Sequence, residues 1–182
     1  MRQPGPCDKR AHDDRRPPVA VAWGVGSILL MRHADTVEES LSIRESHRYL
    51  TAEGRRQAVA VGQRLRAELR EQRIAIDLVV TSPVMRAVQT AELVAAALGF
   101  TGPLEALPAL APGGDAHAAA TALQRTGCAL AIGHEPALSA IGALLCRRHA
   151  FPPLHKAQVF LVDDERPIWS LGPGDVAPVA IH

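Results

Sequence analysis

The sequence predicts an α/β fold, a three-layer α/β/α sandwich with a mostly parallel central sheet. Short apolar runs typical of buried strands alternate with longer segments of helical periodicity. This alternation is characteristic of parallel strands connected through helices that cover both faces of a sheet. The 182 residues are 47% hydrophobic and 21% charged, enough for one domain with its own core.

Five strands and four helices are predicted. The strands lie at residues 28–32, 76–81, 128–132, 158–162 and 168–171, and the last two are expected to form a hairpin that turns at 163–166. The helices run from 51 to at least 69, from 82 to about 98, from 115 to about 125 and from 137 to about 146. Thr51 is a suitable N-cap, although Gly54 stands where a capping box has Glu or Gln. Pro83 suits a first helical turn, because its missing N–H is no loss there.

The chain is expected to divide into a disordered leader, a folded domain and a tail, at residues 1–26, 27–175 and 176–182. An export signal is the alternative for the leader, since Arg15-Arg16 precede an apolar run at 19–31. Cleavage after that run would fall near Ala34 and remove the two residues before it, so we expect no export. The run is also too short to cross a bilayer, and we expect no membrane partner.

Charge and cysteine content exclude several classes of protein. The formal net charge of +1 offers no broad positive field for nucleic acid. Cys7, Cys128 and Cys146 are odd in number and not in CxxC pairs, which argues against a disulfide framework and a structural zinc site. We therefore expect a cytoplasmic protein.

Basic side chains follow each of the first three predicted strands. Arg32 and His33 end the first strand, Arg86 lies one helical turn into the helix after the second, and His134 ends the third. The carboxyl ends of parallel strands meet at one edge of the sheet, where such folds bind ligands. Two guanidiniums, two imidazoles and the N–H groups of helix N-termini would form a strong anion site there. A phosphoryl group matches this charge.

Five motifs in order resemble the histidine phosphatase superfamily and, within it, the short phosphohistidine phosphatases of the SixA type. They are Met31-Arg32-His33-Ala34-Asp35, Leu50-Thr51-Ala52-Glu53-Gly54, Ser82-Pro83 with Arg86-Ala87 and Gln89-Thr90, Leu107-Pro108 with Pro112-Gly113-Gly114-Asp115, and Gly133-His134-Glu135-Pro136. The resemblance covers about residues 28–172. It implies a phosphoglycerate mutase-like fold and a phosphatase acting on phosphohistidine in proteins.

The resemblance also implies catalytic roles for four residues. His33 would be the nucleophile that takes the phosphoryl group, and Arg32, Arg86 and His134 would hold the phosphate oxygens. An imidazole attacks only when neutral, so the other ring nitrogen of His33 should donate to a backbone carbonyl. His134 would work best protonated, which a bound anion favours. Ser82 is expected first to cap its helix, and its hydroxyl is a further phosphate-binding candidate. No metal or cofactor is required, because the guanidiniums supply positive charge.

The chain departs from the family pattern in its general acid. The mutase-like members carry a glutamate downstream of the second motif, and Ala109 stands where we would expect an acid in many SixA-like chains. Asp35 and Glu105 are the remaining candidates. Because imidazole is a better leaving group than an alkoxide, a missing acid favours phosphoramidate substrates. Only 48 positions separate Arg86 from His134, too few for the helical lid of the sugar-phosphate members, so we expect an open pocket.

The expected partner is a phosphorylated protein that displays phosphohistidine. One alternative keeps the mechanism but acts on a small phosphorylated metabolite, either a phosphomonoester or a nucleotide. Another is a catalytically silent phosphate-binding module, which the missing acid suggests. A metal site of His33, Asp35 and His134 is disfavoured because the arginines would repel a cation. Lys156 could reach the pocket rim, although a solvated lysine is the plainer interpretation.

Overall fold

The fold is known from a computed structural model that describes residues 26–40 and 44–181, so the expected leader up to residue 25 lies outside the described residues. The strands are β1 (Ile28–Arg32), β2 (Leu78–Thr81), β3 (Leu104–Ala106), β4 (Ala129–Gly133), β5 (Val159–Asp163), β6 (Arg166–Leu171) and β7 (Val179–Ala180). The helices are α1 (Ala52–Gln72), α2 (Met85–Leu98), α3 (Ala116–Leu123) and α4 (Ala137–Leu145), with 3-10 turns η1 (Glu45–His47) and η2 (Pro108–Leu110). No helix in the described part is long and apolar enough to cross a membrane.

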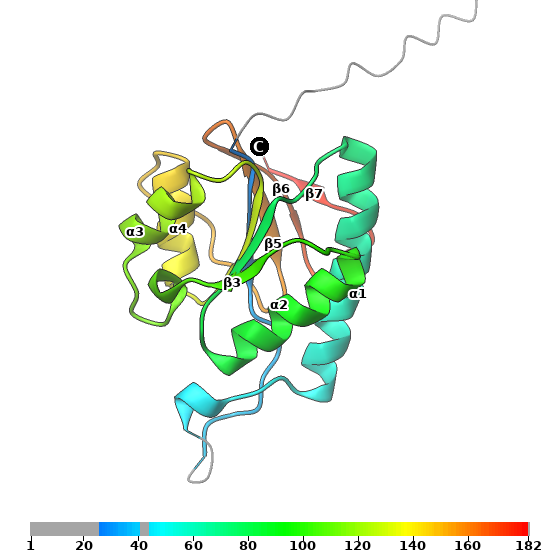
Figure 1. Cartoon of the computed structure of the whole chain (residues 1–182), viewed down its shortest axis with the longest axis vertical. Helices are drawn as coiled ribbons and strands as arrows, with labels where there is room; N and C mark the ends of the chain where they lie inside the picture. The colour runs from blue at the N-terminus through cyan, green and yellow to red at the C-terminus, as the bar shows by residue number, and fades with distance from the viewer. Residues whose placement is uncertain (1–25, 41–43, 182) are drawn as a thin grey trace, which may run out of the picture.

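The strands form one sheet in the order β3-β2-β4-β1-β5-β6-β7, with α1 and α2 on one face and α3 and α4 on the other (Figure 1). The predicted three-layer α/β/α sandwich is confirmed. The sheet is mixed and not purely parallel, because β1 to β4 pair in parallel whereas β5, β6 and β7 are added antiparallel. A two-residue turn joins β5 to β6, and only antiparallel neighbours can be joined so tightly.

Two short strands were not predicted from the sequence. β3 has three residues and β7 has two, and all of them are exposed, so neither carries the apolar run that marks a buried strand. β7 lies within residues 176–182, the expected tail, and pairs with β6. The sheet therefore extends past residue 175.

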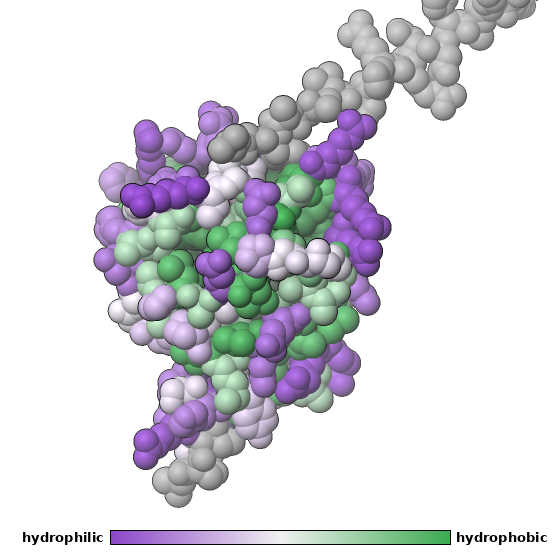
Figure 2. Space-filling model, in the orientation of Figure 1, coloured by the Kyte–Doolittle hydropathy of each residue, from purple (hydrophilic) through white to green (hydrophobic). Residues whose placement is uncertain are grey.

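Alternating side chains of β1 supply both halves of the core. Leu29 and Met31 pack in the cluster under α1 and α2, and Ile28 and Leu30 pack in the cluster under α3 and α4. Successive strand residues point to opposite faces, so a continuous apolar run suits a strand covered on both sides. Figure 2 shows hydrophilic residues along the outward surface of α1, which faces solvent.

The start of α1 explains the incomplete capping box. Thr51 is the N-cap, as predicted, and its hydroxyl accepts the N–H of Gly54 at 2.9 Å. A Cβ atom on residue 54 would lie 2.0 Å from the carbonyl oxygen of Asp35. A glycine is therefore required where α1 touches the segment that follows β1.

The start of α2 differs from the prediction. The helix begins at Met85, its N-cap is Val84, and no side chain caps it. Pro83 thus precedes the first turn, and Ser82 is not the N-cap. The hydroxyl of Ser82 is buried at the end of β2, where it contacts His134.

Replacing Gly54 with alanine is expected to destabilise the protein by about 1–3 kcal/mol, the usual cost of an added methyl in a filled space. Urea unfolding of the Gly54→Ala variant measures this loss. Gly174→Ala is the control, since nothing lies within 4 Å of its added Cβ atom. Equal stability of the two variants would contradict the proposed close packing.

Candidate active site

The register of three parallel strands brings the predicted site residues to one edge of the sheet. Arg32 of β1 lies opposite Gly133 of β4, and Thr81 of β2 lies opposite Ile132. The ladder continues one residue further, because the N–H of His33 donates to Gly133 and that of Ser82 donates to Ile132. His134 directly follows β4. The side chains of His33, Ser82 and His134 therefore meet where the three strands end.

His33 is held as a neutral imidazole with one free nitrogen. Its Nδ1–H donates to the carbonyl oxygen of Ala34 at 2.8 Å, which leaves the lone pair on Nε2. Burial lowers the pKa of His33 to about 4, and the charges of Arg86 and Arg32 add to this effect. At neutral pH the ring is therefore uncharged, the form that a nucleophile requires.

His134 lies beside His33, with ring centroids 5.1 Å apart. Its Nε2 is 2.8 Å from the hydroxyl of Ser82, which also accepts the N–H of Val84. We assign the hydroxyl proton to the bond with Nε2, which leaves the proton of the neutral ring on Nδ1. The pKa of His134 is lowered to about 3, mainly by burial and also by the positive charges of Arg86 and Arg32. The expected protonated form thus requires a nearby anion.

Three buried nitrogens at this edge have no hydrogen-bond partner among the described residues. They are Nε of Arg32, Nε of Arg86 and Nδ1 of His134. Other donors of the two arginines have partners: one terminal nitrogen of Arg32 donates to the carbonyl of Leu154 at 2.9 Å, and both terminal nitrogens of Arg86 contact Glu45. Unpaired buried donors are costly and rare in folded proteins. Their convergence fits an oxyanion such as phosphate.

Two residues outside the predicted set hold this arrangement in place. The carboxylate of Glu135 accepts the N–H of Leu154 at 2.9 Å and so fixes the loop whose carbonyl binds Arg32. The hydroxyl of Thr90 accepts the N–H of Ala34 at 3.1 Å and donates to the carbonyl of Arg86 at 2.7 Å. Both belong to motifs found in the sequence, although their positioning roles could not be inferred from it.

Neither predicted acid is placed to give up a proton at neutral pH. Asp35 accepts from Lys156 at 2.6 Å and from Thr51 at 2.8 Å. These contacts, with Lys156 first, hold the pKa of Asp35 below its usual range. Glu105 is exposed on the edge strand β3, and two strands separate β3 from β1. Lys156 is not simply solvated, because this ion pair ties it to the segment after His33.

Sequence reasoning missed a third acid, Glu45. It lies in η1, in a segment without hydrophobic periodicity, and no motif marks it. Figure 1 shows this segment, drawn in blue and cyan, projecting below the sheet beside the start of α1. Its carboxylate is 2.7 Å from Arg86.

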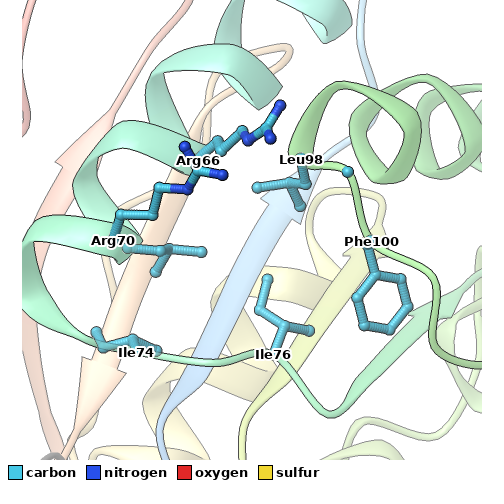
Figure 3. Close-up of a pocket in the computed structure, with 8 residues that line it drawn as sticks. Arg66, Arg70, Ile74, Ile76, Leu98 and Phe100 are labelled. Atoms are coloured by element: carbon cyan, nitrogen blue, oxygen red, sulfur yellow. The ribbon is translucent and has the colours of Figure 1, made fainter.

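A separate pocket of about 170 Å³ lies at the other end of the sheet. Figure 3 shows Arg66 and Arg70 of α1 on one side and Leu98 and Phe100 on the other. Its remaining lining includes Ile76, which precedes β2. The site residues follow the strands instead, so this pocket is distinct from the candidate site.

Comparison with known proteins agrees with this geometry. The family model described as "Histidine phosphatase superfamily (branch 1)" matches residues 28–112. Over these residues the chain is similar to the histidine phosphatase superfamily, and the SixA structures described below share its fold. This similarity supports a phosphatase. The matched range contains His33 and Arg86, and His134 lies beyond it.

Solved structures of SixA proteins are similar to this chain. The protein histidine phosphatase SixA complexed with tungstate is 27% identical, with a TM-score of 0.70 over 81% of this chain and 97% of that one. A putative phosphohistidine phosphatase SixA from Nakamurella multipartitia is 28% identical, with a TM-score of 0.58 over 78% and 86%. A phosphoglycerate mutase from Plasmodium falciparum, 18% identical with a TM-score of 0.55 over 86% and 88%, shares the fold. No curated protein matches the sequence.

The two imidazoles are expected to stay neutral well below the ordinary histidine pKa of 6.5. An NMR titration of ring resonances should find both uncharged at about pH 5, and added phosphate should raise the pKa of His134. Since the unfolded chain binds these protons near pH 6.5, folding stability should decline as the pH falls below that value. Titration of either ring at its ordinary pKa would contradict the burial described above.

Proposed function

We propose that this protein is a phosphohistidine phosphatase that works through a covalent phosphohistidine on His33. The observation that carries the proposal is a neutral imidazole with a free Nε2 beside three buried donors that lack partners. The free nitrogen supplies the nucleophile. The donors on Arg32, Arg86 and His134 match the oxygens of a phosphoryl group and the charge of its transition state.

The reaction proceeds in two balanced steps. Nε2 of His33 bonds to phosphorus while the phosphorus–nitrogen bond of the substrate breaks, and a substrate ring already protonated on its other nitrogen leaves as neutral imidazole. Water then attacks phosphorus and Nε2 regains its electron pair. Dihydrogen phosphate departs and gives a proton to solvent. The hydrogen bond from Nδ1 to Ala34 keeps the attacking nitrogen correctly oriented throughout.

Two observations favour a protein-bound phosphoramidate as substrate. Asp35 is paired with Lys156 and ionised, and Glu105 is remote, so neither supplies the proton that an alkoxide leaving group needs. No helix that begins between Arg86 and His134 is longer than the eight-residue α3, so we expect no helical lid there to keep a large partner from the site. The similarity to SixA structures supports the same assignment. We place the reaction in the cytoplasm, consistent with the cysteine content.

Incubation with a labelled phosphodonor should produce a phosphoenzyme that is labile in acid and stable in base. His33→Ala should abolish the label, because the accepting nitrogen is removed. His149→Ala is the matched control, since His149 is exposed and lies outside the site. Full labelling of His33→Ala would refute the mechanism.

Substrate class is decided by turnover. A phosphorylated histidine protein should be hydrolysed with a much higher kcat/KM than a panel of sugar phosphates and nucleotides. Faster turnover of the panel would identify a small-molecule phosphatase instead. Phosphate binding without turnover of any substrate would identify a silent binding module.

A further inference from the structure

Glu45 forms an ion pair with Arg86, whose guanidinium a phosphoryl group would bind. Its Oε1 lies 2.7 Å from one terminal nitrogen of Arg86, and its main-chain oxygen accepts from the other at 2.8 Å. Only Nε of Arg86 is left without a partner. Glu45 therefore takes one N–H of each terminal nitrogen, and a substrate must compete with this carboxylate for the charge of Arg86.

The same carboxylate has a second anchor. Its Oε2 accepts from Arg48 at 2.9 Å, and Arg48 is itself held by the hydroxyl of Thr36 at 2.8 Å and the carbonyl of Val37 at 2.7 Å. Glu45 thus bridges two guanidiniums. It can release Arg86 and remain attached to Arg48, because each arginine binds a different oxygen.

Arg86 and Glu45 differ in how deeply they are buried. The side chain of Arg86 is 4% exposed and that of Glu45 is 49% exposed. The buried guanidinium needs an anion, whereas the half-exposed carboxylate can turn toward solvent at little cost. The hydrogen bond from Arg48, and then the charges of Arg86 and Arg48, hold the pKa of Glu45 below its usual range. The carboxylate is therefore ionised at neutral pH.

We propose that Glu45 is a built-in counterion of Arg86 that the phosphoryl group of the substrate displaces, so that the site selects dianionic phosphoryl groups over singly charged anions. The inference rests on the proposed function of this site. A singly charged anion offers Arg86 no more charge than the tethered carboxylate already does. A dianion contacts Arg86, Arg32 and His134 at once and carries twice the charge of the carboxylate, so it can replace Glu45.

This exchange also acts on product release. Once the phosphoenzyme is hydrolysed, Glu45 competes with the phosphate for Arg86 from a fixed distance, without diffusing to the site. Return of the carboxylate restores the resting ion pair and helps to expel phosphate. Glu45 therefore limits phosphate affinity while it speeds turnover at saturating substrate.

The test measures anion binding to Glu45→Gln by calorimetry, with inorganic phosphate and nitrate as probes. Phosphate should bind about tenfold more tightly than to the wild type, because a charge-assisted competitor is removed. The affinity for nitrate should increase by a larger factor than the affinity for phosphate. The ratio of phosphate affinity to nitrate affinity should therefore be smaller in the variant than in the wild type. Glu53→Gln is the matched control: it breaks the exposed Glu53–Arg56 pair on α1, 2.7 Å long, and should leave both affinities unchanged.

A second readout uses stability and kinetics. Without phosphate, Glu45→Gln should have a lower Tm than the wild type, because Arg86 is left buried without its anion. Added phosphate should raise the Tm of the variant by more than that of the wild type. With a phosphohistidine protein, both KM and kcat should fall, since phosphate leaves more slowly.

An unchanged phosphate affinity in Glu45→Gln would overturn the proposal, whatever happens to turnover. A loss of kcat with unchanged phosphate affinity would instead make Glu45 a proton carrier. Direct phosphate binding does not depend on phosphoenzyme formation. The failure of this inference is thus separable from failure of the proposed function.

Discussion

The site depends on the parallel pairing of β4 with β1 on one side and with β2 on the other. This pairing aligns Arg32 with Gly133 and Thr81 with Ile132, so the residues that follow the three strands emerge at the same edge. A slip of one residue would turn alternate side chains to the opposite face and separate the two imidazoles. The apolar side chains on both faces of β1 prevent such a slip, because every one of them is buried against helices.

The same constraint explains the electrostatics of the site. Buried arginines and imidazoles lose their hydration, so the folded protein favours neutral rings and leaves several donors without partners. Each unpaired buried donor costs about 1–3 kcal/mol. The two packed core clusters offset this cost. The protein thereby keeps a site whose charges are oriented before an anion arrives, which is the arrangement that stabilises a phosphoryl transition state without reorganisation.

Backbone contacts extend this organisation beyond the strands. The loop before β5 supplies the carbonyl of Leu154 to Arg32 and the N–H of Ala157 to the carbonyl of His33. Glu135 fixes that loop from the start of α4, and Thr90 ties α2 to the segment after β1. The side chains around the phosphoryl position are therefore held by four different parts of the fold, and a change in any of these supports alters the geometry at His33.

Long elements were predictable because their periodicity is strong, whereas short exposed ones were not. Apolar residues at helical spacing and continuous apolar runs marked α1 and β1, but β3 and β7 bury no residue and leave no such pattern. Ser82 was assigned to a helix cap because Ser-Pro commonly begins helices, and its contact with His134 spans 52 positions. The pairing of Glu45 with Arg86 spans 41 positions and lacks any local signal.

The sequence by itself determined the α/β fold class and the presence of basic residues after three strands. These follow from local patterns, since the apolar periodicity places the elements and chain order then places Arg32, His33 and His134 at strand ends. Only the tertiary structure decided the antiparallel pairing of β5 with β1, the neutral imidazoles, the ion pair between Asp35 and Lys156, and the counterion of Arg86. Protonation and ion pairing depend on burial and on distances between remote segments, and neither quantity exists until the chain has folded.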